Sequence, residues 1–268
     1  MCKQWTKCKS YLKLVAAYIR LNCNIQLEYK GAFVSQFAAM FLNNSAWLAF
    51  WLLFFDRFPV VKGFGQNDVV TLWAICAAGF GLSSTFFYNV QELAPLIGRG
   101  QLDTWMLYPR ALLPHLALGK MSATAVGDLA FGYITYVLLV RPDCAHFALF
   151  VLLTLSVAML FVGFNLIRGS LAFFVGNAEV LSEQWFFSMI TFSTYPSSLF
   201  DGWVKLVLYT LIPAGFVSGL PVEALKHFDL TCAALALAGA FAMLLVGIFC
   251  FYLGLNHYQS GNLIEMRN

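Results

Sequence analysis

The sequence predicts an all-α integral membrane protein with six transmembrane helices and an N-terminal cytoplasmic interfacial helix. Two observations carry this prediction. The 268 residues are 60% hydrophobic and only 11% charged, whereas soluble domains carry about 25% charged residues. Apolar runs of roughly 20 residues, the length a helix needs to cross a bilayer, recur along the whole chain. We therefore expect residues 1–268 to form a single transmembrane domain with no separate soluble domain.

Residues 1–30 are predicted to lie on the cytoplasmic leaflet as an interfacial helix. They begin with the basic stretch MCKQWTKCKS, which has no apolar core followed by a cleavage site, so we expect no removable signal peptide and a cytoplasmic N-terminus. From Tyr11 to Lys30 the apolar residues recur at helical spacing and polar residues share another face. The apolar set is Leu14, Tyr18, Leu21 and Ile25, and the polar set is Lys13, Arg20 and Asn24.

The six spans are predicted at about residues 31–55, 69–90, 112–140, 147–167, 204–220 and 230–255. Residues 169–203 mix acids with aromatics around a Tyr195-Pro196 break, and we expect an irregular or interfacial segment there without a full span. In the last span, Ala234, Ala238 and Ala242 recur every fourth residue, a spacing that predicts close packing on another helix.

The distribution of lysine and arginine predicts the orientation, because these residues concentrate on the cytoplasmic side of membrane proteins. With the N-terminus inside, the outer loops hold only Arg57, Lys62, Arg141 and Lys226. The other twelve of the sixteen basic residues fall inside: Lys3, Lys7, Lys9, Lys13, Arg20, Lys30, Arg99, Arg110, Lys120, Arg168, Lys205 and Arg267. Both termini and the loop between the second and third spans are therefore expected in the cytoplasm.

The sequence contains no recognisable motif for enzyme chemistry. The Gly119-Lys120 pair lacks the preceding glycine and following hydroxyl residue of a phosphate-binding loop. The four histidines are isolated, and the seven cysteines are scattered singly without metal-ligand spacing. We therefore expect no catalytic residue, no metal, no cofactor and no nucleic-acid partner, and a membrane enzyme or scaffold is disfavoured.

Polar residues inside the apolar spans are candidates for a translocation path or for helix packing, because burying them in lipid is costly. They are Asp128 in the third span, Asn43 and Asn44 in the first, and Asn165 in the fourth. Asp128 also supports an alternative function, an ion-coupled secondary transporter that uses this acid as its ion site. The absence of an evident internal repeat and of a second mid-span acid weighs against that alternative.

The segment GRGQLDTWMLYPR, residues 98–110, interrupts the apolar pattern between the second and third spans. Its glycines bend the chain, Asp103 can cap a short helix, and Pro109 stops that helix. Trp105, Met106 and Leu107 offer apolar contact area with an arginine at each side. The pattern fits both a short helix that docks in a partner's groove and an ordinary loop helix resting on lipid headgroups.

The same segment resembles the signature of a branch of the ABC type-2 permeases, I-x-x-G-x-(L/F)-D-x-x-(L/M)-x-x-P before the third span. The matching residues are Ile97, Gly100, Leu102, Asp103, Met106 and Pro109. The stretch from Tyr195 to Leu225 is similar to that branch's proline-containing region, and the tail from Gly254 to Asn262 is similar to its closing G-x-x-x-Y-x-S-x-N.

The resemblance implies the permease subunit of an ATP-driven transporter in the bacterial inner membrane, most often an exporter, that performs no chemistry itself. Its implied partners are two cytoplasmic ABC ATPase subunits, a second permease that is identical or a sister protein, and membrane lipid. It also implies that the segment couples to the ATPases. The residues expected to do so are Gly100, Leu102, Asp103, Trp105, Met106, Pro109 and Arg110.

Overall fold

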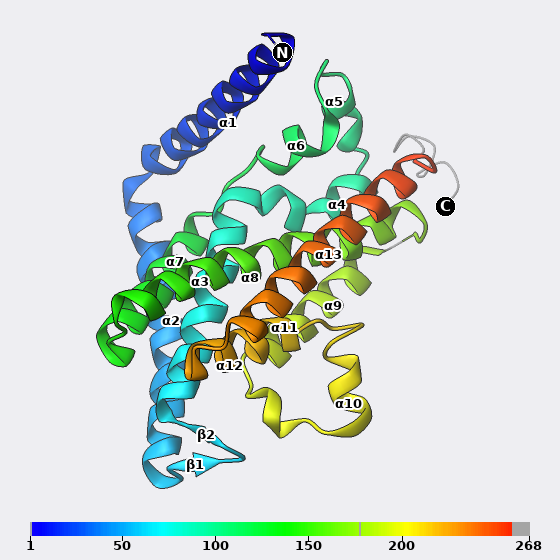
Figure 1. The fold of residues 1–268 in the computed structure, drawn as a ribbon. Coiled ribbons are helices and arrows are strands. Elements are labelled where there is room, and N and C mark those ends of the chain that lie inside the picture. The colour runs from blue at the N-terminus through cyan, green and yellow to red at the C-terminus, as the bar shows by residue number, and fades with distance from the viewer. Residues whose placement is uncertain (1, 177, 259–268) are drawn as a thin grey trace.

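The structure, a computed structural model, describes residues 2–176 and 178–258, with side chains described from Lys13 onward. It is built almost wholly from helices, and the described strands are β1 (Val60–Val61) and β2 (Phe64–Gly65), which pair as an antiparallel hairpin. The N-terminal helix α1 (Cys2–Glu28) is followed after Tyr29 by α2 (Lys30–Arg57), and Figure 1 shows the two running in different directions.

Five stretches of the described chain are long and apolar enough to cross a membrane. They are α2; α3 (Gln66–Gln91) with α4 (Leu93–Gly98); α7 (Ala123–Thr135) with the π-helix η1 (Tyr136–Val140); α8 (Cys144–Ser170) with the 3-10 helix η2 (Leu171–Phe173); and α13 (Leu230–Leu255). This arrangement confirms the all-α membrane class, while the count differs from the six spans expected.

The third span is shorter than predicted. In place of one helix over 112–140, a short α6 (Leu112–Ala117) is followed by an unwound linker and then α7. Carbonyls that a continuous helix would satisfy internally accept hydrogen bonds from elsewhere. Asn89 donates to Leu116 O at 2.9 Å, Asn22 to Leu118 O at 3.3 Å and Gln26 to Met121 O at 3.1 Å. These side chains lie on α3 and α1, so the break depends on tertiary contacts.

The prediction of a single span at 204–220 was wrong. The chain forms α10 (Gly202–Val207), a run of turns, α11 (Gly215–Ser218) and α12 (Leu220–His227) instead. Pro213, Gly215, Gly219 and Pro221 interrupt helical hydrogen bonding here. The regular helix lies earlier, in the segment expected to be irregular: α9 (Ala178–Ser193), followed by the 3-10 helix η3 (Ser197–Leu199).

Two ion pairs locate the chain at the start of α9 and after its end. Near its start, Glu179 Oε1 lies 3.1 Å from Arg99 Nη2, at the end of the molecule that carries α4, α5 (Leu102–Met106) and α6. Beyond its last residue, Asp201 Oδ2 lies 2.9 Å from Lys62 Nζ of the β hairpin. The hairpin and α10 lie at the opposite end of the molecule (Figure 1). The stretch 179–201 therefore runs from one end of the bundle to the other.

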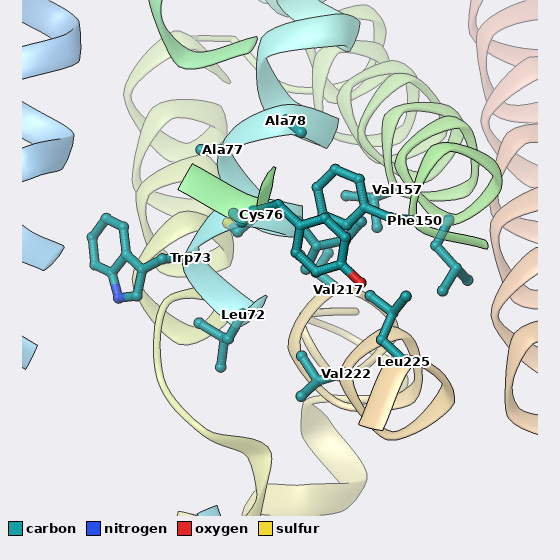
Figure 2. Close-up of a cluster of buried hydrophobic side chains, with 14 of the residues drawn as sticks. Leu72, Trp73, Cys76, Ala77, Ala78, Phe150, Val157, Val217, Val222 and Leu225 are labelled. Atoms are coloured by element: carbon teal, nitrogen blue, oxygen red, sulfur yellow. The ribbon is translucent and has the colours of Figure 1, made fainter. Parts of the chain in front are cut away.

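The core is built around α3, most of whose residues are buried, whereas α2 exposes most of its apolar surface. In Figure 2, Leu72 and Cys76 of α3 lie near Phe150 of α8 and near Val217 and Val222 of α11 and α12. Burial of aliphatic and aromatic side chains in this cluster fixes how the short helices 215–227 sit on the long ones.

The alanine stripe expected to pack is not the face that α13 buries. Ala234, Ala238 and Ala242 are exposed. The buried small residues of α13 are instead Ala233, Ala236, Ala240, Gly247 and Gly254, and Gly247 lies against Gly163 of α8. The helix is rich in small residues on both faces, so the spacing alone did not identify the packed one.

Candidate functional site

Two regions gather all but one of the candidate site residues that the sequence singled out. One is the 98–110 segment, at the end of the bundle where α13 finishes (Figure 1). The other is a cavity between α2, α3, α7 and α9. Among the described residues, no cluster of histidine, cysteine, aspartate and glutamate side chains is placed to hold a metal ion.

The 98–110 segment is a compact turn and helix. Gly100 has φ +67°, in the left-handed region that glycine adopts without strain, and it turns the chain from α4 into α5. Asp103 lies in the first turn of α5, and the residue before the helix is Gln101, which makes no side-chain cap. The role of cap expected for Asp103 is therefore not seen. The helix ends at Met106, three residues before Pro109.

Two side chains of the segment point into the protein. Leu102 is fully buried in a cluster that includes Leu93, Leu166 of α8 and Phe251 of α13. Trp105 packs against the same cluster, and a Cβ on Gly119 would lie 2.2 Å from its ring, so the indole occupies the space that the glycine leaves. The segment is thereby fixed to the ends of the long helices.

Three consecutive side chains face outward. Met106 is 50% exposed, Leu107 84% and Tyr108 51%. We call these residues the Met106–Tyr108 patch. Pro109 and Arg110 beside it are also exposed. The segment thus divides its apolar residues between an inner set that anchors it and an outer set that is available for contact.

His115 of α6 connects the segment to α1. The rings of Trp105 and Tyr108 lie edge-on to its imidazole, with centroids 5.1 and 4.9 Å away. The Tyr18 hydroxyl of α1 lies 2.7 Å from His115 Nδ1. Burial, and then the nearby charge of Arg110, lower the pKa of His115. A neutral imidazole retains one nitrogen that can accept a hydrogen bond from Tyr18.

The segment also meets the last described residues of the chain. The pKa of Tyr258 is raised, first by burial and then by the neighbouring Asp103 carboxylate. The closing motif expected at 254–262 therefore begins beside the 98–110 segment, and its residues after 258 lie outside the described part of the chain.

The second region is a cavity of about 420 Å³. Eight of its 17 lining residues are aromatic, among them Trp47 and Trp51 of α2, Trp73 of α3 and Phe186 of α9. The rings of Trp47 and Trp73 are nearly parallel, at 14°, with centroids 6.3 Å apart. Asn43, Asn44 and Asp128 also line it, so three of the four polar span residues singled out from the sequence meet here.

Asn44 and Asp128 bind each other within this wall. Asn44 Nδ2 donates to Asp128 Oδ1 at 2.5 Å, and both side chains are buried. The bond joins α2 to α7, as expected for a polar residue that holds helices together. Among the described residues, no lysine, arginine or histidine makes an ion pair with Asp128. Asn43 is exposed and lines the cavity without that bond.

Asn165 lies outside both regions and is hydrogen-bonded to Arg168, which entered the sequence analysis only through the distribution of basic residues. Arg168 of α8 is 3% exposed and is held by three elements. Its Nε donates to Asn165 Oδ1 at 2.7 Å, Nη1 to Ser182 Oγ of α9 at 2.9 Å, and Nη2 to Gln91 O of α3 at 2.7 Å. The guanidinium lies 4.6 Å from the centre of the Phe186 ring. The signal in the sequence was an arginine closing a long apolar run.

These features define a class of protein, a polytopic membrane protein with a cavity among its helices. Apolar helices build it, an internal cavity lies between the helices, and a bounded helical segment stands at one end. The chain matches the family described as ABC-2 family transporter protein over residues 41–261, and it belongs to that family. No curated protein and no solved structure matches the chain.

Membership of this family makes the chain an ABC transporter permease, the component that serves transport and is not itself catalytic. Permeases of the family generally work with ATPase subunits.

Proposed function

We propose that the chain is the membrane subunit of an ATP-driven exporter in the bacterial cytoplasmic membrane. It pairs with a second permease, which is identical or a sister protein. The complex contains two cytoplasmic ATPase subunits, and the 98–110 segment is the site at which the ATPase docks on this chain. The observation that carries this proposal is the Met106–Tyr108 patch, which exposes three successive large side chains at the end of an anchored helix. Exposed apolar side chains grouped in this way are typical of interaction sites.

The inner side of the segment supports a role in coupling. Leu102 and Trp105 pack on the cluster that contains Leu166 of α8 and Phe251 of α13. A force applied at the patch is therefore transmitted through close-packed side chains to two membrane-spanning helices. A loop helix that only rested on headgroups would have no need of this anchorage.

The proposed layout retains six crossings, with α9 as the fifth in place of residues 204–220. The ion pairs Arg99–Glu179 and Lys62–Asp201 support it, because they tie the two ends of the 179–201 stretch to opposite ends of the bundle. A helix of 16 residues spans about 24 Å, slightly less than the hydrocarbon thickness of roughly 30 Å. In this layout both termini are cytoplasmic, and Lys205 lies outside.

Cysteine labelling tests this topology. In a chain whose seven cysteines are replaced, Trp203→Cys on α10 is expected to react with a membrane-impermeant thiol reagent in intact cells, because Trp203 is 83% exposed on the outer side. Leu107→Cys, equally exposed, is expected to react only after the cells are opened. Protection of Trp203→Cys until the cells are opened would place α10 in the cytoplasm and remove the α9 crossing.

The docking proposal predicts a specific effect of Leu107→Ser. Burying a leucine side chain contributes about 1.5–3 kcal/mol, so the change is expected to lower the ATPase activity that co-purifies with the tagged chain from its own membrane by at least about tenfold. Size-exclusion behaviour of the variant should be unchanged, because the residue is 84% exposed.

Leu206→Ser is the matched control, since Leu206 is 52% exposed on α10 at the opposite end. It should leave the co-purifying ATPase activity intact. Equal retention in the Leu107 and Leu206 variants would show that the patch is not the docking surface.

A further inference from the structure

Two features of the cavity between α2, α3, α7 and α9 make it energetically unfavourable for the cavity to stay empty. Nearly half of its lining residues are aromatic, and it contains a carboxylate without a cationic partner among the described residues. A carboxylate in a membrane-spanning helix is usually paired, because an isolated charge in hydrocarbon costs several kcal/mol. The single amide hydrogen bond from Asn44 leaves that pairing incomplete.

The faces of the aromatic rings near Asp128 also favour the binding of a positive charge in this cavity. A cation over the face of a tryptophan is attracted by the ring quadrupole, more strongly when water is excluded. Trp47 and Trp73 present nearly parallel rings, and in Figure 2 the Trp73 ring extends from α3 away from Phe150 and Val157. The aromatic rings supply both dispersion contacts and this charge preference.

The lining also argues against small ions and against anions. A metal ion or a proton would not need the aromatic surface, and an anion would meet Asp128. The volume of about 420 Å³ lies within the range of roughly 300–1,000 Å³ found for sites that bind organic molecules. Thr191, Thr194 and Asn43 add neutral polar groups at the wall, which an organic ligand can use for orientation.

We propose that this cavity binds a bulky aromatic monocation, with its charge between Asp128 and the tryptophan faces. The further step, that this cation is a transported cargo, rests on the proposed function. The binding itself depends only on the cavity in the single chain. The two proposals can therefore fail separately.

Tetraphenylphosphonium and tetraphenylborate are suitable probes, because they share size and shape and differ in the sign of their charge. The purified chain in a non-ionic detergent is expected to bind the cation at least about tenfold more tightly than the anion. Quenching of tryptophan fluorescence reports on binding, since Trp47, Trp51 and Trp73 line the cavity.

Asp128→Asn is expected to weaken tetraphenylphosphonium binding by at least about tenfold and to leave tetraphenylborate binding equal or tighter. The amide is close in shape to the carboxylate and keeps an oxygen that can accept from Asn44. Asp201→Asn, an exposed acid at the hairpin end, is the control and should change neither.

Equal affinity for both ions in the unchanged chain would mean that the cavity is an apolar groove for lipid or detergent, and would overturn the proposal. Unchanged cation binding in Asp128→Asn would overturn it as well. Where Asp128→Asn does not fold, Trp47→Leu provides a second variant, since it removes the ring that stacks on Trp73 and is expected to weaken cation binding selectively. A negative result in these assays would leave the ATPase docking result with Leu107→Ser untouched.

Discussion

Arg168→Met is expected to destabilise the folded chain by about 3 kcal/mol or more, because it leaves buried hydrogen-bonding groups of three helices without their donor. For a chain of this size that loss corresponds to a fall of roughly 6–12 °C in melting temperature. Thermal unfolding of the detergent-purified protein, followed by loss of its size-exclusion peak, measures the change. Methionine preserves much of the side-chain volume, so the effect reports mainly on the lost donors.

Arg99→Met is the matched control, because Arg99 also pairs with α9 but does so at the surface, where the arginine and glutamate side chains are 63% and 43% exposed. Exposed ion pairs contribute about 0–1 kcal/mol. Arg168→Lys should be closer to Arg168→Met than to the unchanged protein, since an ammonium cannot reproduce the forked contacts. Similar melting temperatures for Arg168→Met and Arg99→Met would show that the buried contacts do not hold α9 in place.

Gly163→Val is expected to prevent α8 and α13 from packing. A Cβ at Gly163 would lie 2.6 Å from the backbone nitrogen of Leu244 and 2.7 Å from its Cα, so one helix must move. A Cβ at Gly247 of α13 would likewise lie 2.5 Å from Gly163 O, so the close approach involves both backbones. Overpacking costs about 1–3 kcal/mol even in cores that adjust through side chains, and here the obstacle is backbone. We expect little folded protein in size-exclusion chromatography.

Gly31→Val serves as the comparison, because Gly31 is also helical and a Cβ there meets nothing within 4 Å. It carries the same change in helix propensity without the clash. Gly163→Ala should fall between the two. If Gly163→Val yielded as much folded protein as Gly31→Val, the close approach of α8 and α13 would not be required for folding.

The sequence predicted the membrane class and most of the long helices because hydropathy over a run of residues measures the property that a bilayer selects. It also identified the 98–110 segment by its glycines, Asp103 and Pro109, and the structure shows a bounded helix there. The inward direction of Trp105 could not be predicted, because it depends on the space left by Gly119 after the chain has turned back.

In residues 169–220 the long helix was predicted in the wrong place, because hydropathy does not report tertiary contacts. Glu179, Ser182 and Glu183 lower the hydropathy of α9, although Ser182 is buried against Arg168 and Glu179 reaches Arg99. Residues 204–220 are more apolar, yet their prolines and glycines divide them into short pieces. Hydropathy identifies segments that are compatible with lipid. Which of these segments forms a long helix depends on backbone hydrogen bonding and on contacts with residues distant in sequence.

The Asn44–Asp128 hydrogen bond and the hydrogen bonds of Arg168 differ in the order in which ribosomal synthesis supplies their members. Asn44 precedes Asp128 by 84 residues, so the acid emerges when its partner on α2 has already been made. Arg168 has one partner 77 residues before it, at Gln91, and another 14 residues after it, at Ser182. During translation α8 therefore emerges with its arginine before the α9 residue that completes its hydrogen bonding exists, and the nascent chain passes through a stage in which that charge is only partly satisfied.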